Sequence, residues 1–339
     1  MSIGIVTYYN AINEGAFLQA YCLKNFIESC STSKVYFVPN KSADIFSIQK
    51  KQLLQTKNPR LFWVNLNRII ANRKAQKAYL SIGTINKNYD IVVVGSDEMW
   101  NEKNKAFNKY NTAASVNAET RISYAVSMGN FDETLSRDSI KEISKFVAIS
   151  VRDLNSKKIL EAAGFTNGSV HLGPVFLYQI PSQLPKIRKS FIMIYGSSSN
   201  ETTVRKIKEY AHRNGFVTLS VDIYNKWCDV NVAAKNPFQF VGYIDKTNLI
   251  ITNMFHGTML SVVRNKSFIS IQTERRKKKI EYASKKLMFT ERCVDEQFDW
   301  DIEDVLKNKL DFQIINSVIE QEKCFVREYF ARILLNKRE

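Results

Sequence analysis

The sequence has few of the residues on which disulfide-bonded or metal-binding proteins depend. Its five cysteines are odd in number and show no CxxC spacing, and only three histidines occur among 339 residues. This pattern favours neither a disulfide framework nor a structural zinc site, and it is typical of a reducing compartment. We therefore expect a cytoplasmic protein without a metal and without a bound cofactor.

Long apolar runs and nucleotide-binding loops are also missing. The sequence contains neither GxGxxG nor GxxxxGK[ST], so NAD, FAD and P-loop ATP chemistry are not expected. The start, MSIGIVTYYN, is strand-like and differs from a signal peptide, and no run approaches the ~20 apolar residues needed to span a bilayer. Any membrane substrate would then be reached from the membrane surface.

Acidic residues are outnumbered, with 33 Asp and Glu against 49 Lys and Arg, and the resulting charge of +16 implies an anionic partner. No zinc-finger spacing or aromatic RNA-binding signature occurs, so we expect no specific nucleic acid. The basic segment Leu61 to Leu80 is amphipathic and has two interpretations. It packs on its own domain, or it makes a peripheral contact with an anionic membrane.

Hydrophobic residues make up 45% of the chain, and short apolar strands alternate with helical patterns along most of it. Such alternation predicts α/β architecture with two Rossmann-like parallel sheets facing a cleft. We place an N-terminal domain at 1–185, a C-terminal domain at 186–310 and a C-terminal helix at 311–339. Strands are predicted at 2–7, 35–38, 91–94, 121–126, 147–151, 170–176, 191–195, 216–221, 249–252 and 267–271.

Ligands of parallel sheets bind at the carboxyl ends of strands, and His256 follows one such strand in the stretch TNMFHGTML. A helix predicted from residue 259 would leave the backbone N–H groups of Gly257 and Thr258 free to bind an anion. His256 could add a proton or a hydrogen bond there. The alternative is a histidine that only ties a loop together.

Two further strand ends carry polar groups. Ser96, Asp97 and Glu98 follow an apolar strand. The carboxylates of Asp97 and Glu98 could act as a base, bind acceptor hydroxyls or cap a helix. The loop NAINEG, with Asn13 and Gly15, is a weaker form of an anion-binding corner between strand and helix.

Cations also follow predicted strands. Arg152 either pairs locally with Asp153 or extends its guanidinium into the cleft to hold phosphate or carboxylate. The run from Arg275 to Lys279 is largely a solvated face, and Arg275 and Arg276 are near enough to the strand end to reach a ligand.

Taken in order, these segments resemble the polysaccharide pyruvyl transferase family. The similar stretches are GIVTYYNAINEGAFLQAYCL, YDIVVVGSDEMWN, ISYAVSMG, ISVRD, GPVFLY and NPFQFVGYIDKTNLIITNMFHGTMLSVVRNKSFIS. The resemblance implies a fold like that of the two-domain B-type glycosyltransferases. It also implies transfer of the enolpyruvyl unit of phosphoenolpyruvate to two hydroxyls of one sugar, on a cell-surface polysaccharide or its lipid-linked precursor.

The resemblance further implies roles for the residues named above. His256 would be the phosphate ligand or general acid, and Arg152 would clamp the donor with Arg275 or Arg276 as a second cation. Donor contacts would also come from Asn13, Gly15, Gly257 and Thr258, and acceptor contacts from Ser96, Asp97 and Glu98.

The sequence departs from the family pattern at four positions. Asn253 and Met254 stand where aspartate and then serine or arginine are common, Glu98 stands where glutamine is usual, and Gly173 stands where aspartate usually precedes the proline. Two other functions stay open: a glycosyltransferase of the same fold that uses a nucleotide sugar, and a non-catalytic protein that binds anions or glycans.

Overall fold

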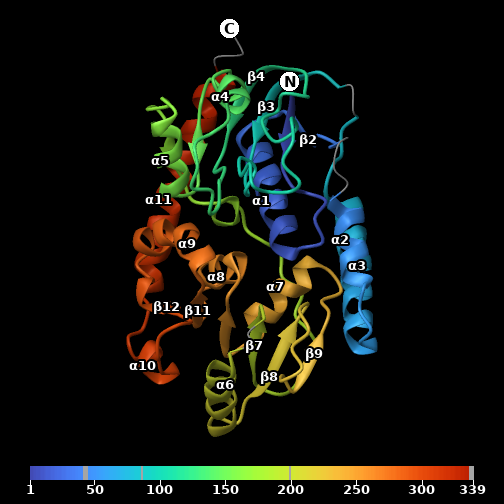
Figure 1. The fold of residues 1–339 in the computed structure, drawn as a ribbon, viewed down its shortest axis with the longest axis vertical. Coiled ribbons are helices and arrows are strands. Elements are labelled where there is room, and N and C mark those ends of the chain that lie inside the picture. Colours follow the sequence, from blue (N-terminus) through green and yellow to red (C-terminus); the bar gives the residue numbers. More distant parts are fainter. Residues whose placement is uncertain (41–44, 85–86, 198–199, 336–339) are drawn as a thin grey trace.

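The structure is a computed structural model that describes residues 1–40, 45–84, 87–197 and 200–335, without the side chains of 274–276 and 335. Two parallel sheets that share no strand occupy successive parts of the chain. They lie at opposite ends of the long axis of the molecule (Figure 1). The α/β class with parallel sheets and a C-terminal helix is therefore as predicted, whereas the domain boundary at residue 185 stays a prediction.

The first sheet has the strand order β2-β1-β3-β4, with every pair parallel. A parallel pair of short strands, β5 and β6, continues it through the bridges Ile122–Ala148 and Val126–Val151. Residues 91–94 of β3 are buried, as expected for a strand covered on both faces. The strands are β1 (Ser2–Val6), β2 (Lys34–Phe37), β3 (Tyr89–Val94), β4 (Ala118–Ser123), β5 (Ser150–Val151) and β6 (Ser169–Val170).

The second sheet has the order β12-β11-β10-β7-β8-β9, again with parallel neighbours. Its central strands are fully buried along their length. The strands are β7 (Phe191–Tyr195), β8 (Val217–Val221), β9 (Val230–Val232), β10 (Leu249–Thr252), β11 (Phe268–Gln272) and β12 (Cys293–Asp295). The short edge strands β9 and β12 were not predicted.

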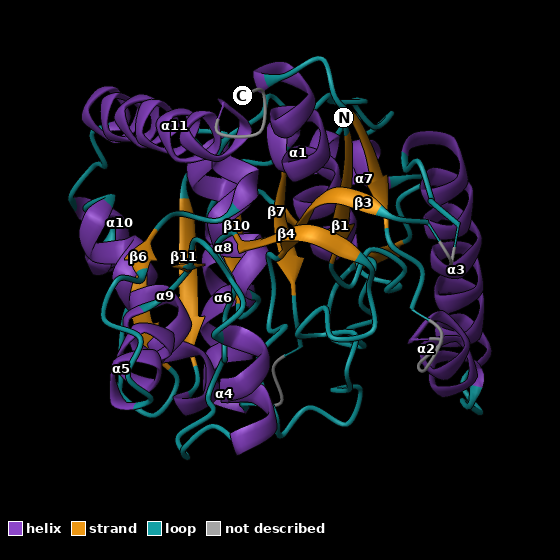
Figure 2. Ribbon diagram, turned by 90° about the horizontal axis from the view of Figure 1, so that it is seen from above, coloured by secondary structure: helices purple, strands orange, loops and turns teal. Residues whose placement is uncertain are grey.

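Helices connect the strands, and α2 and α3 stand at one edge of the molecule in both views (Figures 1 and 2). The helices are α1 (Glu14–Cys30), α2 (Ile45–Leu54), α3 (Pro59–Tyr79), α4 (Arg137–Ile143), α5 (Leu154–Ala162), α6 (Glu201–Arg213), α7 (Pro237–Lys246), α8 (Phe255–Val263), α9 (Glu274–Lys286), α10 (Ile302–Lys307) and α11 (Phe312–Leu335).

The last helix, α11, contacts both halves of the molecule. Its Tyr329 donates a hydrogen bond of 2.7 Å to the carbonyl of Ser123 in β4, and the Phe330 ring packs near Phe26 of α1. The buried carboxylate of Glu322 accepts a hydrogen bond from the backbone N–H of Leu172 and pairs with Lys286 of α9. This helix therefore connects the first sheet to α9 of the second half.

Of the predicted boundaries that are wrong, two affect the site. The strand predicted at 170–176 ends at Val170, because Pro174 lacks a backbone donor and begins a short 3-10 helix, Pro174–Phe176. The helix predicted from residue 259 begins at Phe255. His256 consequently lies inside the first turn of α8.

Candidate functional site

The position of His256 is fixed by close packing of α8 on the second sheet. A Cβ at Gly257 would lie 2.4 Å from Oγ1 of Thr252 and 2.8 Å from the ring of Tyr195. Only glycine allows the helix to begin this close to the strand ends. His256 is therefore held at the carboxyl end of β10, where the sequence predicts it.

The ring of His256 also lies directly on the first turn of α1. A Cβ at Gly15 would be 2.2 Å from Cγ and 2.4 Å from Nδ1 of His256. Asn13 caps this helix by accepting a hydrogen bond of 3.1 Å from the backbone N–H of Ala16. The loop NAINEG thus brings the first half of the molecule against the histidine of the second half.

Burial dominates the chemistry of His256. It lowers the pKa of the imidazole to about 4, while the carboxylates of Asp97 and Glu98 raise it and the cations of Arg152 and Lys279 lower it. The Nε2 atom is buried and has no hydrogen-bond partner among the described residues. A neutral imidazole with one unpaired nitrogen is therefore present at neutral pH.

Arg152 lies at the end of β5 with 5% of its surface exposed. Its guanidinium carbon is 4.3 Å from the centre of the Phe255 ring, and its Nε is buried without a hydrogen-bond partner among the described residues. Asp153 instead caps α5 and accepts a hydrogen bond of 2.6 Å from Ser127. The alternative of a local pair between Arg152 and Asp153 is therefore wrong.

The stem of Arg152 passes beside Gly173. A Cβ at Gly173 would be 3.5 Å from Cδ of Arg152, which is ordinary contact, and the backbone φ of –65° suits any residue. No carboxylate pairs with the guanidinium among the described residues, and glycine at position 173 supplies none.

An ion pair crosses between the halves at Glu98. Its carboxylate pairs with Lys279 of α9 and accepts a hydrogen bond of 3.0 Å from Asn101. Lys279 lies one helical turn after Arg275 and Arg276, whose side chains lie outside the described residues. The lysine run thus contributes a cation to the site from a position that the sequence had assigned to a solvated face.

Two residues predicted to contact substrate already make hydrogen bonds within the protein. Ser96 is fully buried, and its hydroxyl donates a hydrogen bond of 2.9 Å to the carbonyl of Ala125. The backbone N–H of Thr258 donates to Met254 inside α8, and its hydroxyl is 2.6 Å from that of Ser270. The expectation of a free N–H at Thr258 is wrong because the helix begins earlier than predicted.

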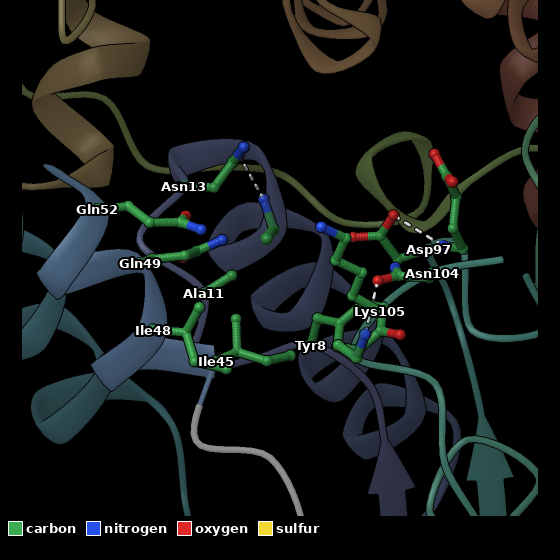
Figure 3. Close-up of a pocket in the computed structure, with 13 residues that line it drawn as sticks. Tyr8, Ala11, Asn13, Ile45, Ile48, Gln49, Gln52, Asp97, Asn104 and Lys105 are labelled. Atoms are coloured by element: carbon green, nitrogen blue, oxygen red, sulfur yellow. Dashed lines mark hydrogen bonds between the residues drawn. The ribbon is translucent and has the colours of Figure 1, made fainter. Parts of the chain in front are cut away.

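A cavity of about 370 Å³ lies beside Asp97 and Glu98. Asp97 has a positive φ of 91° and no helix follows it, so it is not the helix cap considered above. Figure 3 shows Asn13 and the glutamines of α2 on one side of the cavity, with Asp97 and Lys105 on the other. The lining residues are Tyr8, Ala11, Asn13, Ala16, Ile45, Ile48, Gln49, Gln52, Asp97, Glu98, Asn104, Lys105 and Ala106.

A buried polar cluster holds the start of α1 in place. Arg68 of α3 donates two hydrogen bonds of 3.0 Å to the carboxylate of Glu14, and Asn72 donates a third of 2.9 Å. Burial alone would raise the pKa of Glu14, but Arg68 and Asn72 hold the pKa below its usual value. The inner face of the basic helix therefore packs on its own domain, next to the contact between Gly15 and His256.

Within the described residues, no group of three or more His, Cys, Asp or Glu side chains is placed to hold a metal ion. None of the described helices is long and apolar enough to cross a membrane. The expectation of a protein without a cofactor stays a prediction.

The family profile described as polysaccharide pyruvyl transferase matches residues 13–275, which include every donor or acceptor residue predicted from the sequence except Arg276. The chain belongs to the polysaccharide pyruvyl transferase family. Among curated proteins, none matches this sequence. The family is as the sequence predicts.

Solved structures share the fold at low identity. A Listeria monocytogenes protein, provisionally assigned as UDP-N-acetylglucosamine 2-epimerase, aligns with a TM-score of 0.50 and 10% identity over 95% of this chain and 90% of that one. The Neisseria meningitidis UDP-GlcNAc 2-epimerase gives 0.47 and 12% over 98% and 94%. E. coli heptosyltransferase WaaC with ADP gives 0.44 and 10% over 95% and 99%. The alignment with the Listeria monocytogenes protein shows that this chain shares the fold of that protein.

Sequence reasoning missed three contributors to the site. Lys279 could have been found from helical spacing, since it follows Arg275 by one turn of the same helix. Tyr8, bonded to Asn111 at 2.7 Å, and Gln49 of α2 line the cavity and carried no signal. Gln49 lies there because α2 packs on the loop before α1, where the backbone N–H of Ile12 donates a hydrogen bond of 2.5 Å to the Gln49 side chain.

Proposed function

We propose that this chain transfers the enolpyruvyl unit of phosphoenolpyruvate to two hydroxyls of one sugar, forming a pyruvate ketal and releasing phosphate. The acceptor is a cell-surface polysaccharide or its lipid-linked precursor, and the reaction takes place in the cytoplasm at the membrane surface. Membership of the pyruvyl transferase family supports the reaction class.

One observation carries the assignment of the donor site. Nε of Arg152 and Nε2 of His256 are both buried and unpaired among the described residues, and they come from opposite halves of the molecule. Buried polar groups rarely stay without partners unless a ligand supplies them. The positive charge of Arg152 lowers the pKa of His256, so the two groups lie near each other. An anionic donor with a phosphate and a carboxylate would pair with both.

The residues have distinct roles in this proposal. Arg152 and Lys279 bind the negative charges of the donor, and Arg275 and Arg276 stay candidates for the same task. His256 donates a hydrogen bond from its N–H to a phosphate oxygen while the bond between C2 and the bridging oxygen breaks. Asn13 and the N–H groups at the start of α8 orient the phosphate.

The reaction balances without any further reactant. The methylene carbon gains a proton, one sugar hydroxyl adds to C2, phosphate leaves, and the second hydroxyl closes the ketal. The two sugar hydroxyls together lose two protons. One balances the proton that converts the methylene carbon to a methyl group, and the other leaves with phosphate. Asp97, which faces the cavity, accepts a proton from the attacking hydroxyl.

The cavity beside Asp97 is the proposed acceptor site. Its volume of about 370 Å³ lies in the range of small-molecule sites, and its side chains combine amides with an apolar floor of Ile45 and Ile48. Amides and carboxylates are the groups that bind sugar hydroxyls through paired hydrogen bonds. The cavity is therefore suited to a sugar carried on an apolar group.

Thermal unfolding with added ligands tests the donor without knowledge of the acceptor. Phosphoenolpyruvate should raise the Tm, and a nucleoside diphosphate should not, whereas the reverse result would favour a nucleotide-sugar glycosyltransferase. The Tm shift should be lost in Arg152→Gln and reduced in His256→Asn. Incubation with candidate glycans should then release phosphate with formation of a ketal signal by NMR. Unchanged turnover in His256→Asn would contradict the assignment of the site.

A further inference from the structure

The segment that forms α2 and α3 has an unusual charge. Between Ile45 and Tyr89 the sequence has nine lysines and arginines and neither aspartate nor glutamate. Arg68 is bonded to Glu14, but several others make no ion pair within the described residues. These unpaired cations are Lys50, Lys51, Lys57, Arg60, Lys74 and Lys77. More than half of the net charge of the protein is therefore concentrated in this one segment.

The buried face of α3 is unusually polar for a surface helix, although it also holds Ile69, Ala71 and Ala75. Its buried face contains the polar residues Asn65, Arg68, Asn72 and Gln76, whereas Trp63 on the opposite face is 61% exposed. Isolated exposed apolar side chains are common, but a helix that buries its amides and exposes tryptophan is not explained by packing on its own domain.

The exposed groups of α3 form one continuous stripe. Residues 60, 63, 67, 70, 74 and 77 follow the three-and-four spacing that places side chains on a single helix face. The stripe combines the cations Arg60, Lys74 and Lys77 with Trp63 and with Ile70, which is 43% exposed. Tryptophan and aliphatic groups among lysines are typical of helices that lie in the interface of an anionic bilayer.

The position of this stripe agrees with such a partner. Both views place α2 and α3 at an outer edge of the molecule (Figures 1 and 2). Ile48 of α2 is 50% exposed and lines the cavity beside Asp97, so the cavity adjoins the same edge (Figure 3). A surface that contacts this stripe would therefore lie next to the cavity.

We infer that α2 and the outer stripe of α3 dock on an anionic lipid bilayer, with the lysines and arginines near the headgroups and Trp63 and Ile70 inserted at the interface. Charge complementarity and the apolar residues within the basic stripe favour lipid over nucleic acid, which binds through phosphates and stacked bases. If the proposed function holds, docking brings a sugar on a lipid carrier to the cavity beside α2. Only this delivery of the sugar rests on the proposed function, and the docking itself does not.

Co-sedimentation with vesicles tests the inference on the intact chain. The protein should bind vesicles of phosphatidylglycerol and phosphatidylcholine, bind pure phosphatidylcholine weakly, and dissociate as salt is raised. Each lysine removed from the interface should weaken partitioning about fivefold. Lys74→Glu with Lys77→Glu reverses both charges, a change of four charge units, and should therefore lower binding at least 100-fold.

A matched pair in the second half provides the control. Arg205 and Lys208 of α6 are exposed and have the same spacing, so Arg205→Glu with Lys208→Glu makes an identical change in net charge. This variant should keep most of the binding to vesicles. Equal losses in the two double variants would overturn the inference, since they would show that only net charge matters.

Insertion is tested separately from charge. Trp63 is exposed whereas Trp100 is buried and Trp227 and Trp300 are partly buried, so a blue shift of emission on anionic vesicles should disappear in Trp63→Ala. Phe298→Ala removes an aromatic side chain that is 71% exposed in the second half, and this variant should keep the blue shift.

Binding to RNA or duplex DNA but to no vesicle would refute a lipid surface. These assays contain neither phosphoenolpyruvate nor sugar, so their outcome is independent of the proposed reaction.

Discussion

The ring of His256 lies on the α carbon of Gly15, so that a methyl group at position 15 would stand 2.2 Å from Cγ of the imidazole. The two residues come from opposite halves of the molecule, one at the start of α1 and the other in the first turn of α8. The orientation of the proposed catalytic ring therefore depends on a glycine that is distant in sequence.

Gly15→Ala should displace His256 and lower both stability and donor binding. Overpacking of this kind costs about 1–3 kcal/mol of unfolding free energy, and a displaced ring should also reduce turnover at least tenfold. Urea unfolding and phosphoenolpyruvate titration would measure the two effects. Gly168→Ala is the control, because its Cβ would meet no atom closer than 3.8 Å. Normal donor binding in Gly15→Ala would show that this contact does not position the histidine.

Stability should depend on pH through His256. Its pKa of about 4 lies below the ordinary 6.5, so as the pH falls the unfolded chain takes up a proton before the folded protein does. The contribution of the neutral ring is therefore complete above about pH 6.5 and is lost as the pH approaches 4. Between pH 7.5 and 5 it should fall by about 2 kcal/mol.

Urea unfolding of the wild type and of His256→Gln at these two pH values isolates this contribution. The variant lacks the titrating group, so its stability should decline less than that of the wild type by the stated amount. Parallel declines would mean that the imidazole is not held neutral by burial.

Gly173→Asp should reduce donor affinity by neutralising Arg152. The new carboxylate would lie beside the stem of the arginine, and an internal ion pair would compete with the donor for the guanidinium. We expect phosphoenolpyruvate to bind about tenfold more weakly. Gly173→Asn has nearly the same shape without the charge, so it should retain most of the affinity. A similar loss in both variants would indicate a steric effect in place of an electrostatic one.

Glu98 and Lys279 should have opposite effects on the donor. Glu98→Gln removes a negative charge from the site and leaves Lys279 free, so phosphoenolpyruvate should bind severalfold more tightly at neutral pH. Lys279→Met removes a cation and leaves Glu98 unpaired, so the affinity should fall about tenfold. Calorimetric titration with phosphoenolpyruvate measures both affinities. If the ion pair between Glu98 and Lys279 serves only to join the two halves, both variants would weaken donor binding to the same extent.

Much of the fold is readable from the sequence because buried parallel strands are continuous apolar runs. Residues 91–94 and 249–252 are such runs, and both form central strands at the predicted positions. The short edge strand Val230–Val232 has no comparable pattern, since one of its residues is exposed and the others are only partly buried. Pairing with β8 alone determines that it is a strand.

The site was predictable as a set of strand ends but not as a set of contacts. His256 and Arg152 were identified because each follows an apolar strand, whereas the fates of Ser96 and Thr258 depend on local hydrogen bonds to Ala125 and Met254. Lys279 reaches Glu98 only because the two halves pack together. A contact of that kind is a property of the assembled molecule, which no single segment encodes.

The pair between Arg68 and Glu14 joins two parts of the protein that have been considered separately. Arg68 is on the inner face of the same helix whose outer face carries Trp63, and Glu14 precedes the glycine that supports His256. The outer stripe of α3 and the ring of His256 are therefore connected by one buried ion pair and by the peptide bond between Glu14 and Gly15.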